Sequence, residues 1–323
     1  MSNSLHSATF GAMGGRNEVQ VFCEDKSRAE DAIQKIVLEV ARIENKYSRY
    51  QPESVLSQIN ASAGKTEIEV DEETAALLDY ADVCYRQSKR LFDISSGVLR
   101  KVWRFREGVL PEQKDVEKVL QLVDWGKIVW QNRKLRLPEE GMELDLGGIA
   151  KEYAVDRAAG ILLENGLRHS LVNFAGDLRV CGPRANGTSW MVGIANPNES
   201  ASALGALPMM KGAMATSGDY ERRIEIDGKR YSHILNPRTG WPVSGLQSVT
   251  VFAPSCLVAG SMSTTAMLLG QRGENYLKEV GAEYILITSE GETRTSREVR
   301  RLYEKVNSLN KVSRGHTDVA SNS

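Results

Sequence analysis

The stretch that decides the fold is Glu143-Leu-Asp-Leu-Gly-Gly-Ile-Ala-Lys-Glu-Tyr-Ala-Val-Asp-Arg157. Apolar and acidic residues alternate over positions 142–146, which predicts a half-buried strand. Gly147 and Gly148 follow, and glycine allows backbone angles that other residues resist. Apolar residues then recur at helical spacing as far as Gly166, where a helix is expected to end. The stretch therefore predicts a strand that turns sharply into a helix.

The glycine turn has two interpretations. A turn that opens a helix presents N–H groups and the positive end of the helix dipole, which together suit a phosphate. Lys151, in the first turn of this helix, could reach the same anion. The alternative is a tight connection in an ordinary α/β unit, because short glycine motifs often occur by chance. The stretch alone does not choose between them.

Length and composition narrow the class of protein. The chain of 323 residues is long enough for one large domain or two of ordinary size. A hydrophobic content of 41% and a charged content of 26% are typical of soluble globular proteins. The net charge of −1 argues against a nucleic-acid partner, and no apolar run is long enough to span a bilayer. Residues 1–10 lack the features of a signal peptide, so we expect a cytoplasmic protein that does not insert into membranes.

Hydrophobic periodicity predicts further elements along the chain. Strands are expected at 18–23, 66–70, 170–174, 190–194, 248–252 and 284–288, with a hairpin over 127–137. Helices are expected from a cap at Asp25 or Ser27 to about 47, and at 72–90, 114–122, 259–269 and 274–280. This mixture without a dominant βαβ rhythm predicts an α+β fold. We expect one domain over 1–305, with room for two α/β lobes, and a disordered tail over 306–323.

Two polar segments are candidate binding elements, one in the first half of the chain and one at its middle. Ser48-x-Tyr50, with Ser54 and Asn60 after it, could stack on a flat ring and hydrogen-bond its edges, or could be a helix exit and a polar turn. Asn173-Phe-Ala-Gly-Asp177 ends a strand with a carboxylate, which suits either a site or a simple turn. The four cysteines show no CxxC spacing and are expected to be free thiols.

Three further segments lie in the second half. Residues 215–220 and 231–243 are interpreted as short polar loops that hold one histidine and one arginine. His233 could accept a proton near neutral pH, and Arg238 could bind phosphate through two parallel hydrogen bonds, although a single histidine is usually structural. Residues 259–266 begin a helix with small side chains, which allows close approach to a ligand or close helix packing.

Taken in order, these segments resemble the ApbE family, the FAD:protein FMN transferases. The matching pieces extend over about residues 8–300, and the most specific are Asp-Leu-Gly-Gly-Ile-Ala-Lys and His-Ile-x-x-Pro-Arg-Thr-Gly. The pieces are Met13-Gly14, Ser48, Tyr50, Ser54, Asn60, Phe92-Asp93, Trp103, Asp145–Lys151, Tyr153–Asp156, Asn173, Gly176-Asp177, Ala215–Tyr220, His233-Ile234, Pro237–Gly240, Pro242-Val243 and Ser263-Thr264.

The resemblance implies a T-fold-like α+β architecture of mixed or antiparallel sheets with flanking helices. It implies that the protein binds FAD and Mg²⁺ and moves FMN from FAD onto a threonine or serine hydroxyl of an acceptor protein, with release of AMP. His233 would be the base for that hydroxyl. The FAD-binding residues would be Met13, Tyr50, Asn60, Gly147, Gly148, Lys151, Asp177, Thr216, Asp219 and Arg238. The metal would be held by the carbonyl of Ala150 and by Thr264.

Several positions depart from the family pattern. The family's metal-binding aspartate is replaced by Gly260, which is expected to weaken metal binding because Mg²⁺ usually takes at least one carboxylate. Glu152 stands where the family has a glycine, so one hypothesis is that it supplies the missing carboxylate. The alternative is an exposed helix residue, the usual place of a glutamate. The other departures are Gly15 for a threonine, Ala175 for a glycine and Asn236 for an aspartate.

Three functions remain open on this evidence. The first is FMN transfer to an acceptor protein. The second is an FAD-binding relative without transfer activity, a flavin carrier or interaction protein, which Gly260 favours. The third is an FAD pyrophosphatase, in which water takes the place of the acceptor hydroxyl. A nicotinamide dehydrogenase is not favoured, because no GxGxxG motif follows a strand.

Overall fold

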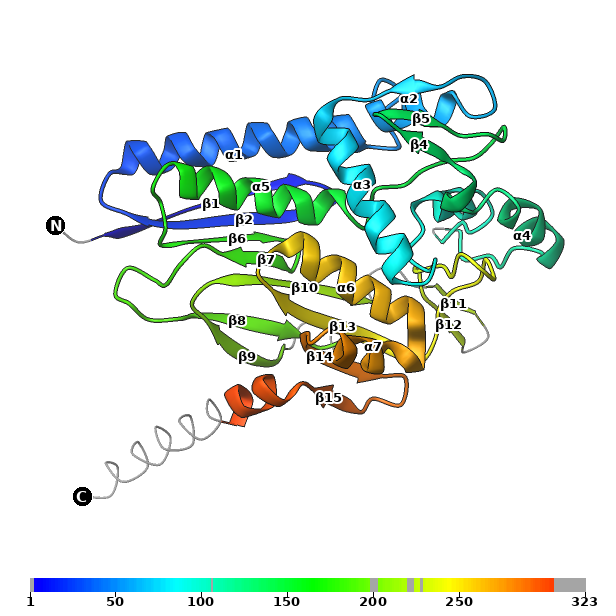
Figure 1. The fold of residues 1–323 in the computed structure, drawn as a ribbon. Helices are drawn as coiled ribbons and strands as arrows, with labels where there is room; N and C mark the ends of the chain where they lie inside the picture. Colours follow the sequence, from blue (N-terminus) through cyan, green and yellow to red (C-terminus); the bar gives the residue numbers. More distant parts are fainter. Residues whose placement is uncertain (1–2, 106, 198–202, 220–223, 227–228, 305–323) are drawn as a thin grey trace, which may run out of the picture.

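The computed structural model of the protein describes residues 3–105, 107–197, 203–219, 224–226 and 229–304 (Figure 1). The predicted tail at 306–323 lies outside these residues, as does Tyr220. The architecture is α+β, as predicted. The four cysteines are free, also as predicted.

The central element is an eight-stranded sheet in which every neighbouring pair of strands is antiparallel. Its order is β1-β2-β6-β7-β10-β13-β14-β15. The bounds are β1 (Ser4–Ala12), β2 (Gly15–Cys23), β6 (Ser170–Phe174), β7 (Asp177–Val180), β10 (Gly212–Gly218), β13 (Leu246–Ala253), β14 (Glu283–Thr288) and β15 (Thr293–Thr295). Antiparallel pairing throughout agrees with the absence of a βαβ rhythm in the sequence.

Helices cover one face of this sheet and a hairpin covers the other (Figure 1). The helical layer contains α1 (Lys26–Tyr47), α3 (Glu72–Gln87), α5 (Ala150–Glu164), α6 (Cys256–Leu269) and α7 (Gly273–Glu279). The hairpin consists of β8 (Trp190–Ala195) and β9 (Ala203–Met209). The larger apolar core lies under the helices, and a smaller one lies under the hairpin. Asp25 caps α1, one of the two caps expected from the sequence.

Smaller elements gather at one end of the sheet (Figure 1). They are α2 (Val55–Ala61), β3 (Ile68–Glu69), the short helix η1 (Ile94–Lys101), α4 (Gln113–Leu120), η2 (Trp125–Lys127), β4 (Val129–Gln131), β5 (Lys134–Arg136), β11 (Ile224–Ile226), β12 (Lys229–Tyr231) and η3 (Gly270–Arg272). A third apolar cluster, centred on Leu99, Trp103 and Leu235, holds η1 and α4 against the segment that follows β12.

Three expectations about local structure were wrong. Residues 142–146 alternate between buried and less buried positions, as predicted, but form no strand. Residues 212–218 were expected to be loop in part, and instead form β10 in the middle of the sheet. Strand β1 was not predicted, because at the edge of the sheet none of its residues is fully buried, and the positions that face the sheet include the polar His6 and small alanines.

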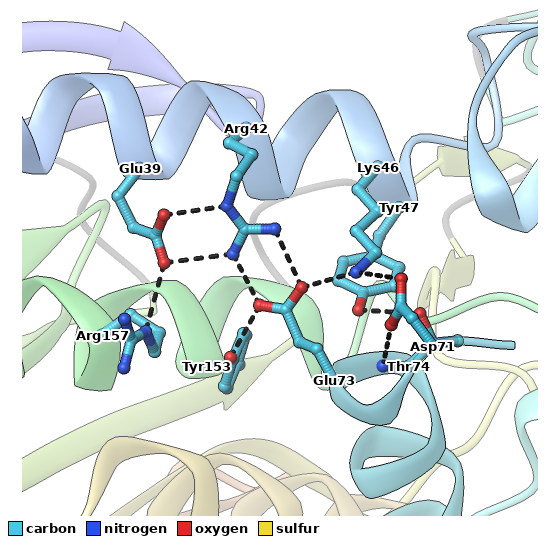
Figure 2. Close-up of polar contacts among 9 residues, drawn as sticks. All are labelled: Glu39, Arg42, Lys46, Tyr47, Asp71, Glu73, Thr74, Tyr153 and Arg157. Atoms are coloured by element: carbon cyan, nitrogen blue, oxygen red, sulfur yellow. Dashed lines mark hydrogen bonds and ion pairs between the residues drawn. The ribbon is translucent and has the colours of Figure 1, made fainter.

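A network of ion pairs fastens the helical layer together (Figure 2). Glu73, at the start of α3, bonds Arg42 and Lys46 of α1 and accepts a hydrogen bond from the Tyr153 hydroxyl of α5. Arg42 also bonds Glu39, which in turn bonds Arg157 of α5. The hydrogen bond from Arg42 is the main reason that the pKa of Glu73 falls from 4.5 to about 2.

Replacing Glu73 by glutamine should destabilise the fold by about 1–2 kcal/mol at pH 7, because charge-assisted hydrogen bonds to three side chains are lost from a partly solvated site. The pKa of Glu73 is lower in the folded state, so its contribution is present above about pH 4.5 and is lost as the pH falls toward 2. Urea unfolding at pH 7 and pH 3 measures the difference. The exposed Glu69, paired with Arg133, gives the control Glu69→Gln, which should change little. An equal effect of Glu73→Gln at both pH values would contradict the assignment.

Candidate functional site

One cavity brings together segments that are distant in the sequence. Its wall includes the glycine turn and the first turn of α5, the end of β10, the face of α6, residues 91–100 and residues 233–235. The predicted site residues on this wall are Gly147, Gly148, Lys151, Thr216, His233 and Thr264. The cavity therefore joins the two most specific motifs of the sequence in one place.

The glycine turn is shaped by Asp145. One oxygen of its carboxylate accepts a hydrogen bond of 2.8 Å from the N–H of Gly147, and the other lies 2.9 Å from Arg49 and 3.6 Å from Arg100. Burial alone would raise the pKa of Asp145, but the charges of the two arginines outweigh it and hold this pKa below its usual value. The N–H of Gly147 is thus already bonded, while Lys151 and Arg100 line the same wall with their positive charges.

Asn60 holds the segment before the turn. Its side-chain amide donates to the carbonyl of Leu144 over 3.0 Å and accepts from the N–H of Leu144 over 2.7 Å. This pairing, together with the hydrogen bond from the N–H of Asp145 to the carbonyl of Ile94, holds residues 142–146 in place without a neighbouring strand. Asn60 therefore contacts the backbone and positions the glycine turn.

Asp177 ties three elements together under the cavity. It is 2% exposed. Its Oδ2 lies 2.6 Å from Nζ of Lys151 on α5, and its Oδ1 accepts a hydrogen bond of 3.0 Å from the N–H of Thr216 on β10. Asp177 thus orients Lys151, while Lys151 itself lines the cavity.

Helix α6 is fixed at both its start and its middle. Asp156 of α5 accepts hydrogen bonds of 2.9 Å from the N–H groups of Cys256 and Leu257, which places a carboxylate at the N-terminus of α6. Arg179 pairs with the same carboxylate at 2.6 Å. Further along, Ser217 of β10 bonds the hydroxyl of Thr264 at 3.0 Å. Thr264 is thereby held at the cavity wall.

His233 lies on a loop that the third apolar cluster supports. Nε1 of Trp103 donates a hydrogen bond of 2.7 Å to the carbonyl of Gly240, and the rings of Trp103 and Trp241 meet edge to face at 5.1 Å. Gly240 has a φ of +70°, and a Cβ there would lie 2.5 Å from Val116, so this tight turn requires glycine. The loop is therefore positioned by packing that lies outside the cavity.

Replacing Trp103 by phenylalanine should lower stability by about 1–2 kcal/mol, because the buried carbonyl of Gly240 loses its donor. It should also change the binding or turnover of a ligand in the cavity, since the loop of His233 loses a support. Trp190 offers a matched control, because its Nε1 donates over 2.9 Å to the carbonyl of Gly182 in the core under the hairpin. Trp190→Phe should cost similar stability in urea unfolding and leave the kinetics unchanged. Identical kinetic effects of the two variants would contradict the positioning role.

The remaining predicted residues lie outside the cavity wall. Met13 occupies the β1–β2 turn with a φ of +55° and donates its N–H to Glu44. Tyr50 is 79% exposed. Asp219 follows the end of β10.

Arg238 is exposed and lies in a second cavity, beside Lys89 and Arg272, with a hydrogen bond to the carbonyl of Lys89. Ala150 is buried and begins α5.

Glu152 departs from the usual place of a glutamate. It is 6% exposed and lies on the cavity wall, so the interpretation as an exposed helix residue is wrong. Burial, together with the nearby charge of Asp177, raises the pKa of Glu152 to about 7. Its Oε2 accepts no hydrogen bond from any residue that the structure describes. Asp145 and Arg100 also line the cavity and were not among the predicted site residues, although Asp145 belongs to the quoted motif.

Two features are absent from the described part of the chain. No group of three or more His, Cys, Asp or Glu side chains there is arranged to hold a metal ion. A metal at this cavity would therefore depend on hydroxyl and carbonyl oxygens, on few carboxylates, and on the phosphates of a substrate, which is how Mg²⁺ is often bound. None of the helices described there is long and apolar enough to cross a membrane.

Comparison with known proteins gives a consistent family. The model of the ApbE family matches residues 13–286. FAD:protein FMN transferases of Klebsiella pneumoniae and Salmonella typhimurium are each 31% identical, over 83% and 87% of this chain and 84% and 83% of theirs. The crystal structure of the ApbE protein of Thermotoga maritima superposes with a TM-score of 0.86 at 28% identity, over 93% of this chain and 99% of that one. The chain therefore belongs to the ApbE family.

Proposed function

We propose that this protein is an FAD:protein FMN transferase that moves FMN from FAD onto a threonine or serine hydroxyl of an acceptor protein. The observation that carries the proposal is the single cavity in which His233, Lys151 and the glycine turn meet. The relatives that are 31% identical carry the same activity in their names. Membership of the family, with a cavity formed from both specific motifs, favours transfer over the alternatives.

The reaction needs few groups from the protein. The acceptor oxygen forms a bond to the phosphorus on the FMN side of the pyrophosphate, the bridging P–O bond breaks, and AMP leaves with the bridging oxygen. His233 accepts the proton of the acceptor hydroxyl as the new bond forms. Lys151 lies where it can neutralise phosphate charge, and Asp177 holds it there. Positioning and charge neutralisation account for most of the catalysis of phosphoryl transfer.

The residues around the cavity fit a magnesium ion. Ala150 offers a carbonyl and Thr264 a hydroxyl, and oxygen donors of this kind suit Mg²⁺. Glu152 adds a carboxylate on the same wall, and its Oε2 lacks a protein donor among the described residues. When bound, Mg²⁺ would supply positive charge against the phosphates of FAD.

The direct test is incubation of the full chain with FAD, Mg²⁺ and a panel of acceptor peptides, each with a single threonine or serine. Transfer predicts that one or more peptides gain the mass of an FMN phosphoester while AMP appears in equal amount. FMN and AMP without any gain in mass would instead indicate hydrolysis. Bound FAD that stays intact would indicate a carrier. Either of the last two results would contradict the proposal.

A further inference from the structure

Glu152 is a buried acid whose position calls for a positive partner. Its side chain is 6% exposed, and Oε2 accepts no hydrogen bond from the described residues. Buried polar atoms in native proteins nearly always have a partner, and a buried carboxylate without one is costly. Since Glu152 lines the cavity, the missing partner can come from the cavity side.

The surrounding charges do not supply that partner. Nζ of Lys151 lies 2.6 Å from Oδ2 of the buried Asp177. Arg179 is paired in the same way with Asp156, also at 2.6 Å. Three carboxylates, those of Glu152, Asp156 and Asp177, thus share two cations, which favours a bound cation beside Glu152.

Gly260 of α6 faces Glu152 directly. A Cβ built on Gly260 would lie 2.5 Å from Cγ of Glu152 and 3.0 Å from its Oε1, closer than non-bonded carbon atoms approach. Positions 152 and 260 therefore share one space, which can hold the side chain of only one of them. Thr264 follows Gly260 by one helical turn, so its hydroxyl lies on the same face of α6.

We propose that Glu152 is the carboxylate ligand of the metal site, and that Gly260 is a glycine because the Glu152 side chain occupies the space beside it. The inference rests on the proposed function, which places a divalent cation in this cavity. In this chain the carboxylate comes from α5, and α6 contributes the hydroxyl of Thr264. A single carboxylate with neutral oxygen donors is a set that Mg²⁺ accepts when phosphates complete its coordination.

Binding of Mn²⁺, measured by electron paramagnetic resonance on the full chain with FAD present, tests the ligand without measuring activity. Glu152→Gln keeps the shape of the side chain and removes its charge. It should weaken Mn²⁺ binding by at least about tenfold, the lower end of the effect of disturbing even an outer-shell partner. Glu164→Gln, at the exposed end of the same helix, should bind Mn²⁺ as the unmodified protein does. Unchanged Mn²⁺ binding in Glu152→Gln would overturn the proposal.

The shared space is tested by exchanging the two residues. The double variant Glu152→Gly with Gly260→Asp places the carboxylate on α6 and should bind Mn²⁺ more tightly than Glu152→Gln. A folded double variant, judged by circular dichroism, that binds no better than Glu152→Gln would overturn the shared-space argument. The outcome is separable from the proposed function. If the protein transfers FMN but Glu152→Gln leaves Mn²⁺ binding unchanged, this inference alone is overturned. If Mn²⁺ binding depends on Glu152 but the protein does not transfer FMN, the proposed function alone is overturned.

Discussion

Replacing His233 by alanine should lower the rate of FMN transfer by about 10²–10⁴-fold, the usual contribution of a positioned acid or base. His233 lies on the cavity wall together with Lys151 and Thr216. An acceptor hydroxyl attacks phosphorus poorly until its proton has somewhere to go, and an imidazole accepts protons near neutral pH. The loss should appear in kcat, with FAD binding retained, because the proposed role concerns proton transfer.

The measurement is the initial rate of peptide labelling, with FAD affinity followed separately by flavin fluorescence. His169 provides the control, because its ring bonds the carbonyl of Pro183 at 2.7 Å and does not line the cavity. His169→Ala should keep most of the activity. If His233→Ala reduces the rate no more than His169→Ala does, His233 is not the base.

Replacing Lys151 by methionine should lower the free energy of unfolding by about 3 kcal/mol, because it leaves the carboxylate of Asp177 buried without its cation. Asp177 is 2% exposed, and Nζ of Lys151 lies 2.6 Å from its Oδ2. The nearby carboxylate of Glu152 adds to the excess of negative charge. Urea unfolding at pH 7 measures this loss.

A second variant separates the two roles of Lys151. Adding Asp177→Asn to Lys151→Met removes the stranded charge and keeps the oxygen that accepts from Thr216, so most of the stability should return. Lys151→Met should also weaken FAD binding, and FAD affinity should stay low in the double variant, because the cation for the phosphates is still missing. Recovery of both properties would show that Lys151 acts only through the fold, and recovery of neither would contradict the pairing with Asp177.

The sequence predicted the long helices and four of the eight strands of the sheet, β2, β6, β13 and β14, because those elements carry clear periodicity. In α1, buried residues such as Ala32, Ile36, Val40 and Ile43 recur at helical spacing behind the cap at Asp25. Strand β10 was missed for a physical reason. Its residues are small because Ser217 must come within 2.8 Å of Ser263 on α6, and small side chains have little preference for strands.

The segment before the glycine turn has the alternating pattern of a strand but forms none. Leu144 and Leu146 are buried as their alternation predicts, yet Asn60 bonds the backbone of Leu144, and the N–H of Asp145 donates to the carbonyl of Ile94. Hydrogen bonds to such distant segments leave no trace in local periodicity. A strand and an irregular segment held in this way therefore share the same sequence pattern.

Motifs in the sequence predicted several of the residues that line the cavity. They did not predict burial or exposure that depends on contacts with other segments. Lys151 and His233 belong to the two most specific motifs, and both line the cavity. The burial of Glu152 could not be foreseen, because it depends on α6 presenting a residue without a side chain at Gly260. The exposure of Tyr50 was equally hidden, since local sequence does not say which side of a turn faces solvent.

The cavity wall combines segments as far apart in the sequence as Leu91 and Leu268. It also includes the end of β10, a strand in the middle of the sheet. Contacts between distant segments form late, because closing long loops costs entropy before any contact compensates for it. A chain still growing on the ribosome has the glycine turn long before it has α6, and so has only part of the wall. The cavity is therefore complete only after residues as late as Leu268 have been synthesised and have packed against the earlier segments.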